Sequence, residues 1–173
     1  MGTSTPDGFR IPSTKVTITG QGIDTDRFQP GENQDRNRIV SIGRISPVKH
    51  YEVLIDAMHL LRARGRGAVR LEIIGGATLS SEVNYRDQLR SDVARLALDD
   101  TVTIRAGVPH HAVAHEYQQA AIFASCSQTG SLDKAVLEAA STGAIPITTN
   151  PALASFFGPE ASEHMPEQTS AAD

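Results

Sequence analysis

The sequence predicts an α/β fold in which helices cover both faces of a doubly wound parallel sheet. Short runs rich in β-branched residues alternate along the chain with segments of helical period, which is typical of βαβ units. Several of these runs, such as residues 39–42 and 71–74, are almost continuously apolar. Strands have this composition when both faces of a parallel sheet are buried. Right-handed crossovers are then expected between the strands.

The strands are expected in chain order at residues 16–19, 39–42, 69–74, 102–104, 121–124 and 145–149. The first strand stands apart from the others because a polar stretch over residues 29–38 follows it. The composition of that stretch, which includes Pro30 and Gly31, predicts a loop.

Three helices are predicted from apolar residues that recur every three or four positions. Ser80 and Ser81 are candidate N-cap residues of the second helix, and Gly143 is placed to end the third. The apolar faces carry Val53, Leu54, Ala57, Met58 and Leu61 in the first helix, Leu89, Val93, Leu96 and Ala97 in the second, and Leu132, Ala135, Val136, Ala139 and Ala140 in the third.

Length and composition predict a single folded domain. The chain has 173 residues, of which 39% are hydrophobic, and this is enough to bury one core. We expect an N-terminal extension over residues 1–14, the domain over residues 15–157 and a disordered polar tail over residues 158–173.

Charge and cysteine content exclude several classes of protein. A formal net charge of −4 does not favour nucleic acid or an anionic membrane as the main partner. A single cysteine, Cys126, excludes an internal disulfide framework and a Cys-rich zinc module. No apolar run approaches the roughly 18–20 residues of a membrane-spanning helix. We therefore expect a cytoplasmic protein.

The loop after residues 39–42 is the first candidate site. Ligands of open parallel sheets bind at the carboxyl ends of the strands, near helix N-termini. Gly43 allows a tight turn there, and Pro47 suits the start of a helix. Arg44 and Lys49 flank this helix start, where two cations can hold an anion such as a diphosphate. The alternative is two solvated surface cations.

Other strand ends add further candidates. Gly75 and Gly76 predict a tight turn or the close approach of a ligand, and the backbone around Gly107 can contact a base ring. Residues 125–131 are small and polar and precede the third helix, which predicts a second anion cradle. The loop at residues 43–49 lacks the Gly-x-Gly-x-x-Gly spacing, so a nicotinamide dinucleotide is disfavoured.

The third helix carries a polar stripe. Ser131, Lys134 and Glu138 lie within about 60° of one another at ~100° per residue. This arrangement suggests Lys134 on a phosphate and Glu138 on a ribose diol. An ordinary i,i+4 ion pair between Lys134 and Glu138 is the alternative.

Other residue patterns do not predict a metal site or a hydrolase. His111 and His115 have the i,i+4 spacing of metal ligands but not the His-Glu-x-x-His arrangement. Ser127 and Ser131 lack the context of a nucleophile elbow. Cys126 is expected to be a small buried residue.

Five stretches of the chain form an ordered set, at residues 20–28, 42–49, 71–76, 102–108 and 129–139. In this order they resemble the C-terminal, nucleotide-sugar-binding domain of the retaining glycosyltransferases of family 4, the group 1 glycosyl transferases. The resemblance implies a Rossmann-like domain that is one half of the two-domain GT-B fold. It implies a UDP- or GDP-type nucleotide-diphosphate sugar as donor, with no metal or other cofactor required.

The resemblance also implies roles for single residues. Arg44 and Lys49 would grip the diphosphate and stabilise the charge that develops on it in catalysis, and Glu138 would bind the ribose. Gly130 stands where the Glu-x7-Glu pattern of the family has its first glutamate, which lies at the donor sugar. Residues that would complete the nucleotide site are Gly43, Gly107, Thr129, Gly130, Ser131, Leu132, Asp133 and Lys134, with Thr129, Ser131, Asp133 and Lys134 as the candidates to replace the missing glutamate.

Complete enzymes of the family are longer and carry an N-terminal domain that binds the acceptor. We therefore expect a truncated donor domain that binds nucleotide sugar and transfers little sugar alone. The acceptor would be a sugar, a lipid or a small molecule, and the full enzyme could work at the inner face of a membrane. Two alternatives stay open, namely a non-catalytic nucleotide-binding or interaction module of the same fold, and a GT-B phosphorylase or epimerase domain.

Overall fold

A five-stranded parallel sheet forms the centre of the protein. The computed structural model describes residues 2–5, 13–127 and 131–166. Neighbouring strands in the sheet follow the order β5-β4-β3-β6-β7, and every pair is parallel. The predicted α/β fold with a parallel, Rossmann-like sheet is confirmed. The strands are β3 (Asp35–Ile42), β4 (Arg70–Ile74), β5 (Val102–Arg105), β6 (Ala120–Ser125) and β7 (Ile145–Thr148).

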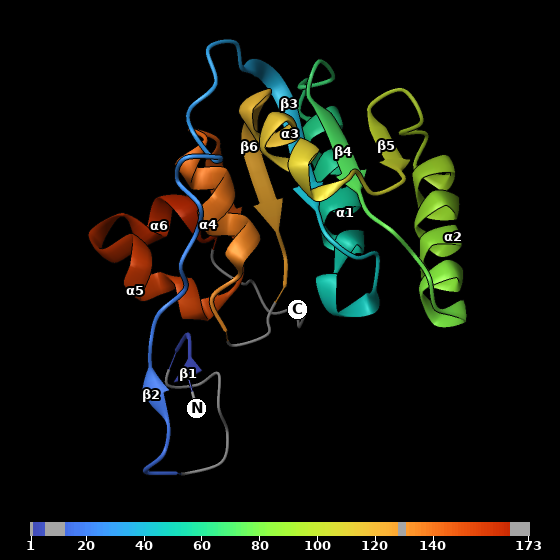
Figure 1. Ribbon diagram of the computed structural model, residues 1–173. Coiled ribbons are helices and arrows are strands. Elements are labelled where there is room, and N and C mark those ends of the chain that lie inside the picture. The colour runs from blue at the N-terminus through green and yellow to red at the C-terminus, as the bar shows by residue number, and fades with distance from the viewer. Residues whose placement is uncertain (1, 6–12, 128–130, 167–173) are drawn as a thin grey trace.

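Helices cover both faces of this sheet (Figure 1). On one face, α1 (Tyr51–Ala63) and α2 (Ser80–Arg95) bury residues such as Ile55 and Leu89 against Leu71 and Ile73 of β4. On the other face, α3 (Val113–Gln118) and α4 (Lys134–Ser141) pack against β3 and β6. Burial of these apolar faces supplies the main driving force for the fold.

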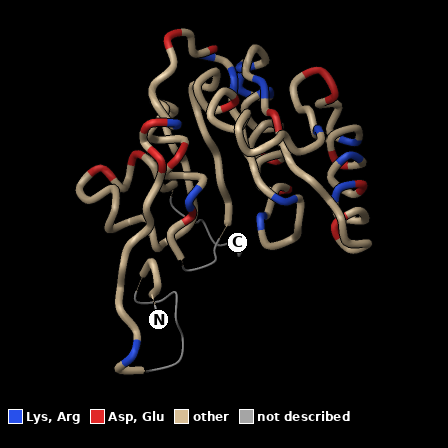
Figure 2. Tube along the Cα trace, in the orientation of Figure 1, with Lys and Arg blue, Asp and Glu red and all other residues tan. Residues whose placement is uncertain are grey.

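Charged residues of both signs lie on the outer surface of α2. Figure 2 shows Lys and Arg alternating with Asp and Glu along this helix. Asp87 lies 3.0 Å from Arg86, and Asp92 lies 2.6 Å from Arg95. Such exposed pairs keep the solvent face polar and contribute little to stability.

Strand β3 begins earlier than the sequence pattern indicates. The polar stretch at residues 29–38 was predicted to be a loop, but its last four residues belong to the strand. The reason is that Arg38 is buried and its guanidinium binds the carboxylates of Glu72 and Glu116 at 2.8 and 2.5 Å. Because Arg38 is buried through ion pairs, the first residues of β3 lack the apolar pattern by which strands are predicted.

The N-terminal segment forms a separate pair of short strands. Gly2–Thr3 (β1) pairs in parallel with Thr17–Ile18 (β2), which lies inside the strand expected at residues 16–19. Figure 1 shows this pair beyond the lower end of the main sheet, toward which the arrow of β6 points.

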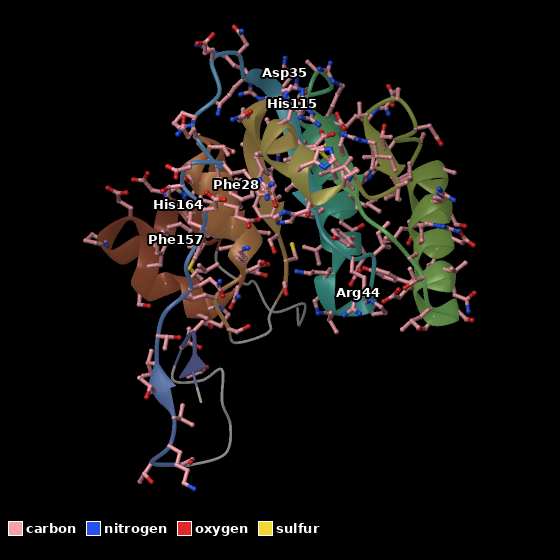
Figure 3. All side chains as sticks on the ribbon, viewed as in Figure 1. Phe28, Asp35, Arg44, His115, Phe157 and His164 are labelled. Atoms are coloured by element: carbon pink, nitrogen blue, oxygen red, sulfur yellow. The ribbon has the colours of Figure 1, made fainter. Side chains whose placement is uncertain are left out.

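Four short helices follow β7, and the last two of them lie where the sequence predicts a disordered tail over residues 158–173. They are η4 (Pro151–Leu153), α5 (Ala154–Phe157), η5 (Gly158–Glu160) and α6 (Ala161–His164). His164 stacks on Phe157 with ring centroids 4.5 Å apart, and its Nδ1 lies 2.9 Å from the carbonyl oxygen of Pro146 (Figure 3). These contacts fix residues 158–164 against β7, and residues 167–173 lie outside the described residues.

Candidate functional site

The sheet reverses its winding between β3 and β6. From β3 the chain moves outward to β4 and β5, and then returns to the other side of β3 to form β6 and β7. The loops that leave the carboxyl ends of β3 and β6 therefore run in opposite directions. They are residues 43–50, which include η2 (Pro47–Lys49), and residues 126–133, of which 128–130 lie outside the description. This switch point is the position at which open parallel sheets bind ligands.

The loop after β3 is fixed by its neighbours. The N–H of Gly43 donates to the carbonyl of Ile74 at 3.0 Å, and the N–H of Ile45 donates to the carbonyl of Gly76 at 2.9 Å. From α1, the hydroxyl of Tyr51 donates to the carbonyl of Gly43 at 3.3 Å. The loop is therefore held by the backbone of residues 74 and 76 and by the side chain of Tyr51.

Lys49 and Asp133 meet across the switch point. The Lys49 Nζ lies 3.4 Å from the Asp133 Oδ2, and both side chains are largely buried. The hydroxyl of Ser125, at the end of β6, donates to the same oxygen at 3.1 Å. The other carboxylate oxygen accepts the N–H of Ala135 at 3.2 Å, so Asp133 is the N-cap of α4. Burial and the nearby Asp133 carboxylate both raise the pKa of the Tyr51 phenol.

Arg44 lies at the same edge but turns toward α2. Its Nε is 3.3 Å from Oε1 of Glu82, and Figure 3 shows Arg44 near the lower ends of α1 and α2. Glu82 also accepts the N–H groups of Thr78 and Leu79, at 2.9 and 3.2 Å. These backbone hydrogen bonds, together with the Arg44 charge, lower the pKa of Glu82. The structure thus places Arg44 and Lys49 in one loop and pairs each with a different acid.

Glu82 also corrects the predicted cap of α2. The helix begins at Ser80 with Leu79 as its N-cap residue, so neither Ser80 nor Ser81 holds that position. The Glu82 carboxylate caps the first turn in their place, which a search for hydroxyl caps does not detect.

Glu138 and Lys134 form the i,i+4 ion pair that was the alternative interpretation of their spacing. The Lys134 Nζ lies 3.1 Å from Oε1 of Glu138, whose side chain is only 7% exposed. That buried oxygen accepts no hydrogen bond of normal geometry from the described residues. Burial, and then the nearby Glu138 and Asp133 charges, raise the pKa of the Tyr117 phenol on α3. Glu138 is therefore the most buried residue of the polar stripe that Ser131, Lys134 and Glu138 form.

The loop before α4 is described from Ser131 onward. The Leu132 N–H donates to the Ser4 hydroxyl at 3.4 Å, which brings the N-terminal segment to this loop. The side-chain amide of Asn150 donates to the Ser131 carbonyl at 2.8 Å. Thr129 and Gly130, both predicted site residues, lie outside the described residues.

The glycine loops contact one another closely. A Cβ at Gly75 would lie 1.9 Å from the Gly43 carbonyl oxygen, which is a severe clash. A Cβ at Gly107 would lie 3.3 Å from the backbone nitrogen of Gly76. Gly75 is thus required for the loop after β4 to pack on the loop after β3. The packing of the two loops therefore accounts for Gly75 without a ligand. Gly107 lies beside Gly75 and Gly76 of the loop after β4.

Four residues that the sequence reasoning missed, or treated as interchangeable with others, hold this region together: Ser125, Asp133, Glu82 and Asn150. An Asp immediately before an apolar helical run is a helix-start signal and predicts the Asp133 cap. The contacts of Ser125 with Asp133 and of Asn150 with the Ser131 carbonyl join two loops that the fold brings together, and no local pattern identifies them. Glu82 caps its own helix through Thr78 and Leu79, but its pairing with Arg44 depends on the fold.

Within the described residues, the histidines and the cysteine do not form a metal site at the switch point. Figure 3 shows His115 beside Asp35 at the end of the molecule opposite Arg44, and His110 lies 2.8 Å from Arg27. Among residues 2–5, 13–127 and 131–166, no group of His, Cys, Asp and Glu is arranged to hold a metal ion. Burial, and then the Glu52 charge, raise the pKa of the Cys126 thiol to about 11. The thiol is therefore protonated at neutral pH.

Within the described part of the chain, no helix has the length and apolar character needed to cross a membrane.

A shallow surface hollow lies away from the switch point, at the outer edge of the sheet between α2 and β5. Its lining includes Arg90, Asp99 and Thr103, and none of the predicted site residues takes part in it.

Comparison with known proteins identifies related sequences. The family model for glycosyl transferases group 1 matches residues 22–155. D-inositol 3-phosphate glycosyltransferase of Frankia alni is 27% identical over 150 residues, which are 79% of this chain and 37% of that protein. The protein of the same name from Stackebrandtia nassauensis is 30% identical over 140 residues, 72% of this chain and 29% of its own length. The chain thus spans about a third of these curated relatives.

Solved structures share the fold. HepE of Anabaena, crystallised with UDP-glucose, superposes with a TM-score of 0.69 at 17% identity and covers 81% of this chain and 40% of its own. The C-terminal domain of LpcC, a group 1 glycosyl transferase family protein of Francisella tularensis, has a TM-score of 0.66 at 21% identity and covers 76% of this chain and 72% of its own. At these identities the likeness establishes the architecture.

Proposed function

The chain belongs to the glycosyl transferases of group 1, and on that premise we propose that it binds a nucleotide-diphosphate sugar at the switch point between β3 and β6. One observation carries the proposal. The Lys49 ammonium group and the first turn of α4 meet at this point, at the carboxyl ends of two parallel strands. A cation beside a helix N-terminus favours a phosphate group. The UDP-glucose bound to HepE supports a donor of this chemical class.

We assign the diphosphate to Lys49, to the N-terminus of α4 and to Arg44. Arg44 is 66% exposed at its side chain, so it is free to leave Glu82 and turn toward a ligand. In sugar transfer these groups would stabilise the negative charge that develops on the departing diphosphate. Glu138 would accept hydrogen bonds from the ribose, after separating from Lys134. We expect transfer with retention of configuration and without a metal ion, as the family resemblance implies.

A thermal-shift experiment tests donor binding. We expect UDP, UDP-glucose or GDP at millimolar concentration to raise the melting temperature, because a ligand that binds only the folded state stabilises it. Lys49→Ala should weaken nucleotide binding about tenfold, since one charge-assisted contact to phosphate is lost. Arg86→Ala removes a cation that pairs with Asp87 on α2, and it is the matched control. If no nucleotide in the panel raises the melting temperature, donor binding by this chain is contradicted.

Sugar transfer itself is tested separately. The chain spans about a third of its curated relatives, and we expect it to bind nucleotide while transferring little sugar alone. An assay with a sugar donor and a panel of acceptors measures this directly. Acceptor-dependent turnover by the 173-residue chain would contradict that expectation and leave donor binding supported.

A further inference from the structure

The carboxylate of Asp133 already engages the groups assigned to phosphate. One of its oxygens lies 3.4 Å from the Lys49 Nζ and 3.1 Å from the Ser125 hydroxyl. The other oxygen accepts the Ala135 N–H at the start of α4. An acidic side chain therefore holds the same cation and the same helix N-terminus that a ligand phosphate would use.

We propose that Asp133 sets the affinity and the charge selectivity of this site by competing with the phosphates of the ligand for Lys49. This inference rests on the proposed function, because it concerns the same site. When a nucleotide binds, Lys49 must be shared between the ligand and Asp133 or pass from one to the other. Either way, the carboxylate opposes a negatively charged ligand and lowers its affinity.

The position of the pair makes this competition strong. The Asp133 side chain is 11% exposed and that of Lys49 is 24% exposed. Charges in such surroundings are less screened by water and salt than those of a surface pair. A phosphate that approaches Lys49 therefore meets a carboxylate whose charge is only partly screened.

Selectivity follows from the charge of the ligand. A terminal phosphate, as in a free nucleoside diphosphate, carries about −1.5 to −2 near neutral pH. In a nucleotide sugar that phosphate is joined to the sugar on one side and to the other phosphate on the other, so it keeps only about one negative charge. A more highly charged phosphate depends more on the Lys49 cation, so competition by Asp133 for Lys49 weakens the binding of the free diphosphate more than that of the sugar-linked one. The wild-type site would favour the donor over the nucleoside diphosphate that remains after transfer.

Calorimetric titration of the 173-residue chain tests the proposal, with UDP, UDP-glucose and inorganic pyrophosphate as probes. Asp133→Asn and Asp133→Ser both remove the charge and keep a side chain that can cap α4. We expect each variant to bind UDP and pyrophosphate about three- to tenfold more tightly, with a smaller gain for UDP-glucose. Asp100→Asn is the control, because it removes an equal charge from an exposed pair with Arg62. It should change affinity less than about twofold.

The double variant Lys49→Ala/Asp133→Asn identifies the route of the effect. If Asp133 acts by competing for Lys49, the gain from Asp133→Asn is lost once Lys49 is absent. A gain of the same size with or without Lys49 overturns the competition.

The remaining outcomes separate this inference from the function on which it rests. If the wild type binds UDP and both Asp133 variants bind it equally or more weakly, Asp133 is no competitor and the inference fails while donor binding stands. Equal gains for UDP and UDP-glucose overturn the charge selectivity. If no protein in the set binds any probe, the proposed function fails and the inference fails with it.

Discussion

Gly75 lies at the closest contact between two loops at the carboxyl edge of the sheet. Its α-carbon faces the carbonyl oxygen of Gly43, and an added Cβ would approach that oxygen to 1.9 Å. The loop that carries Arg44 and Lys49 is thereby held against the loop after β4. Because Gly75 has no side chain, the loop after β4 can pack against the loop that carries the candidate site residues.

Gly75→Ala should lower the free energy of unfolding by about 2–3 kcal/mol, because the backbone must shift to accept the methyl group. Gly76→Ala is the matched control, since a Cβ at Gly76 meets nothing within 4 Å. That control should change stability by less than about 1 kcal/mol. Urea denaturation of both variants measures the difference. Equal stabilities for the two variants would show that the close contact is not structurally important.

Single residues also show where sequence reasoning reached its limit at the site. The sequence predicts that Arg44 and Lys49 share one loop, and it identifies Asp133 as one of several polar candidates. It does not predict that Lys49 pairs with Asp133 while Arg44 pairs with Glu82. Side-chain partners across a sheet depend on which loops the topology brings together, and no spacing along the chain records that.

At the scale of the elements, an ion-pair network joins three strands to α3. Arg38 of β3 binds Glu72 of β4 and Glu116 of α3, and Arg105 of β5 binds both carboxylates, at 2.9 and 2.6 Å. The Arg38 side chain is 8% exposed. The network covers part of the α3 face of the sheet, where an apolar pattern would otherwise be expected.

The network makes stability depend on pH. Hydrogen bonds from Arg38, and then from Arg105, lower the pKa of Glu72 although burial opposes the shift. For Glu116, burial acts to raise the pKa, and the two arginines outweigh it and lower the pKa. A lowered pKa in the folded state stabilises the fold above the ordinary carboxyl value of 4.5. This contribution is lost as the pH falls below that value.

Glu116→Gln should therefore cost about 1–2 kcal/mol at pH 7, and the cost should shrink as the pH is lowered toward 3, because the unfolded wild type takes up protons below 4.5 that the folded wild type does not. Asp87→Asn, in an exposed pair, should cost less than about 0.5 kcal/mol at every pH. Denaturation curves over this pH range measure both. A cost for Glu116→Gln that does not change with pH would contradict the role assigned to the network.

The elements with a strong apolar period were predicted well. The sheet strands after residue 38 and helices α1, α2 and α4 lie within a few residues of the predicted positions. The start of β3 was missed because Arg38 is buried through ion pairs. The short helices after β7 were not predicted because each has only three or four residues, too few for a helical apolar period to be recognised. Contacts such as the stacking of His164 on Phe157 hold them in place. Tertiary contacts decide these segments, and local patterns do not show them.

At the scale of the whole molecule, topology places the candidate site. The order β5-β4-β3-β6-β7 brings the loops after β3 and β6 together, although Lys49 and Asp133 are 84 residues apart in sequence. The family match over residues 22–155 covers both loops. The central claim is that nucleotide binds between these two loops.

Backbone amide NMR during a titration with UDP tests that claim most directly, because each amide reports its own surroundings. The account predicts that the largest shift changes fall at residues 43–49 and 131–138, and that they are reduced in Lys49→Ala. Changes concentrated instead at the hollow between α2 and β5, around Arg90 and Thr103, would contradict it. So would a spectrum that does not change at millimolar UDP.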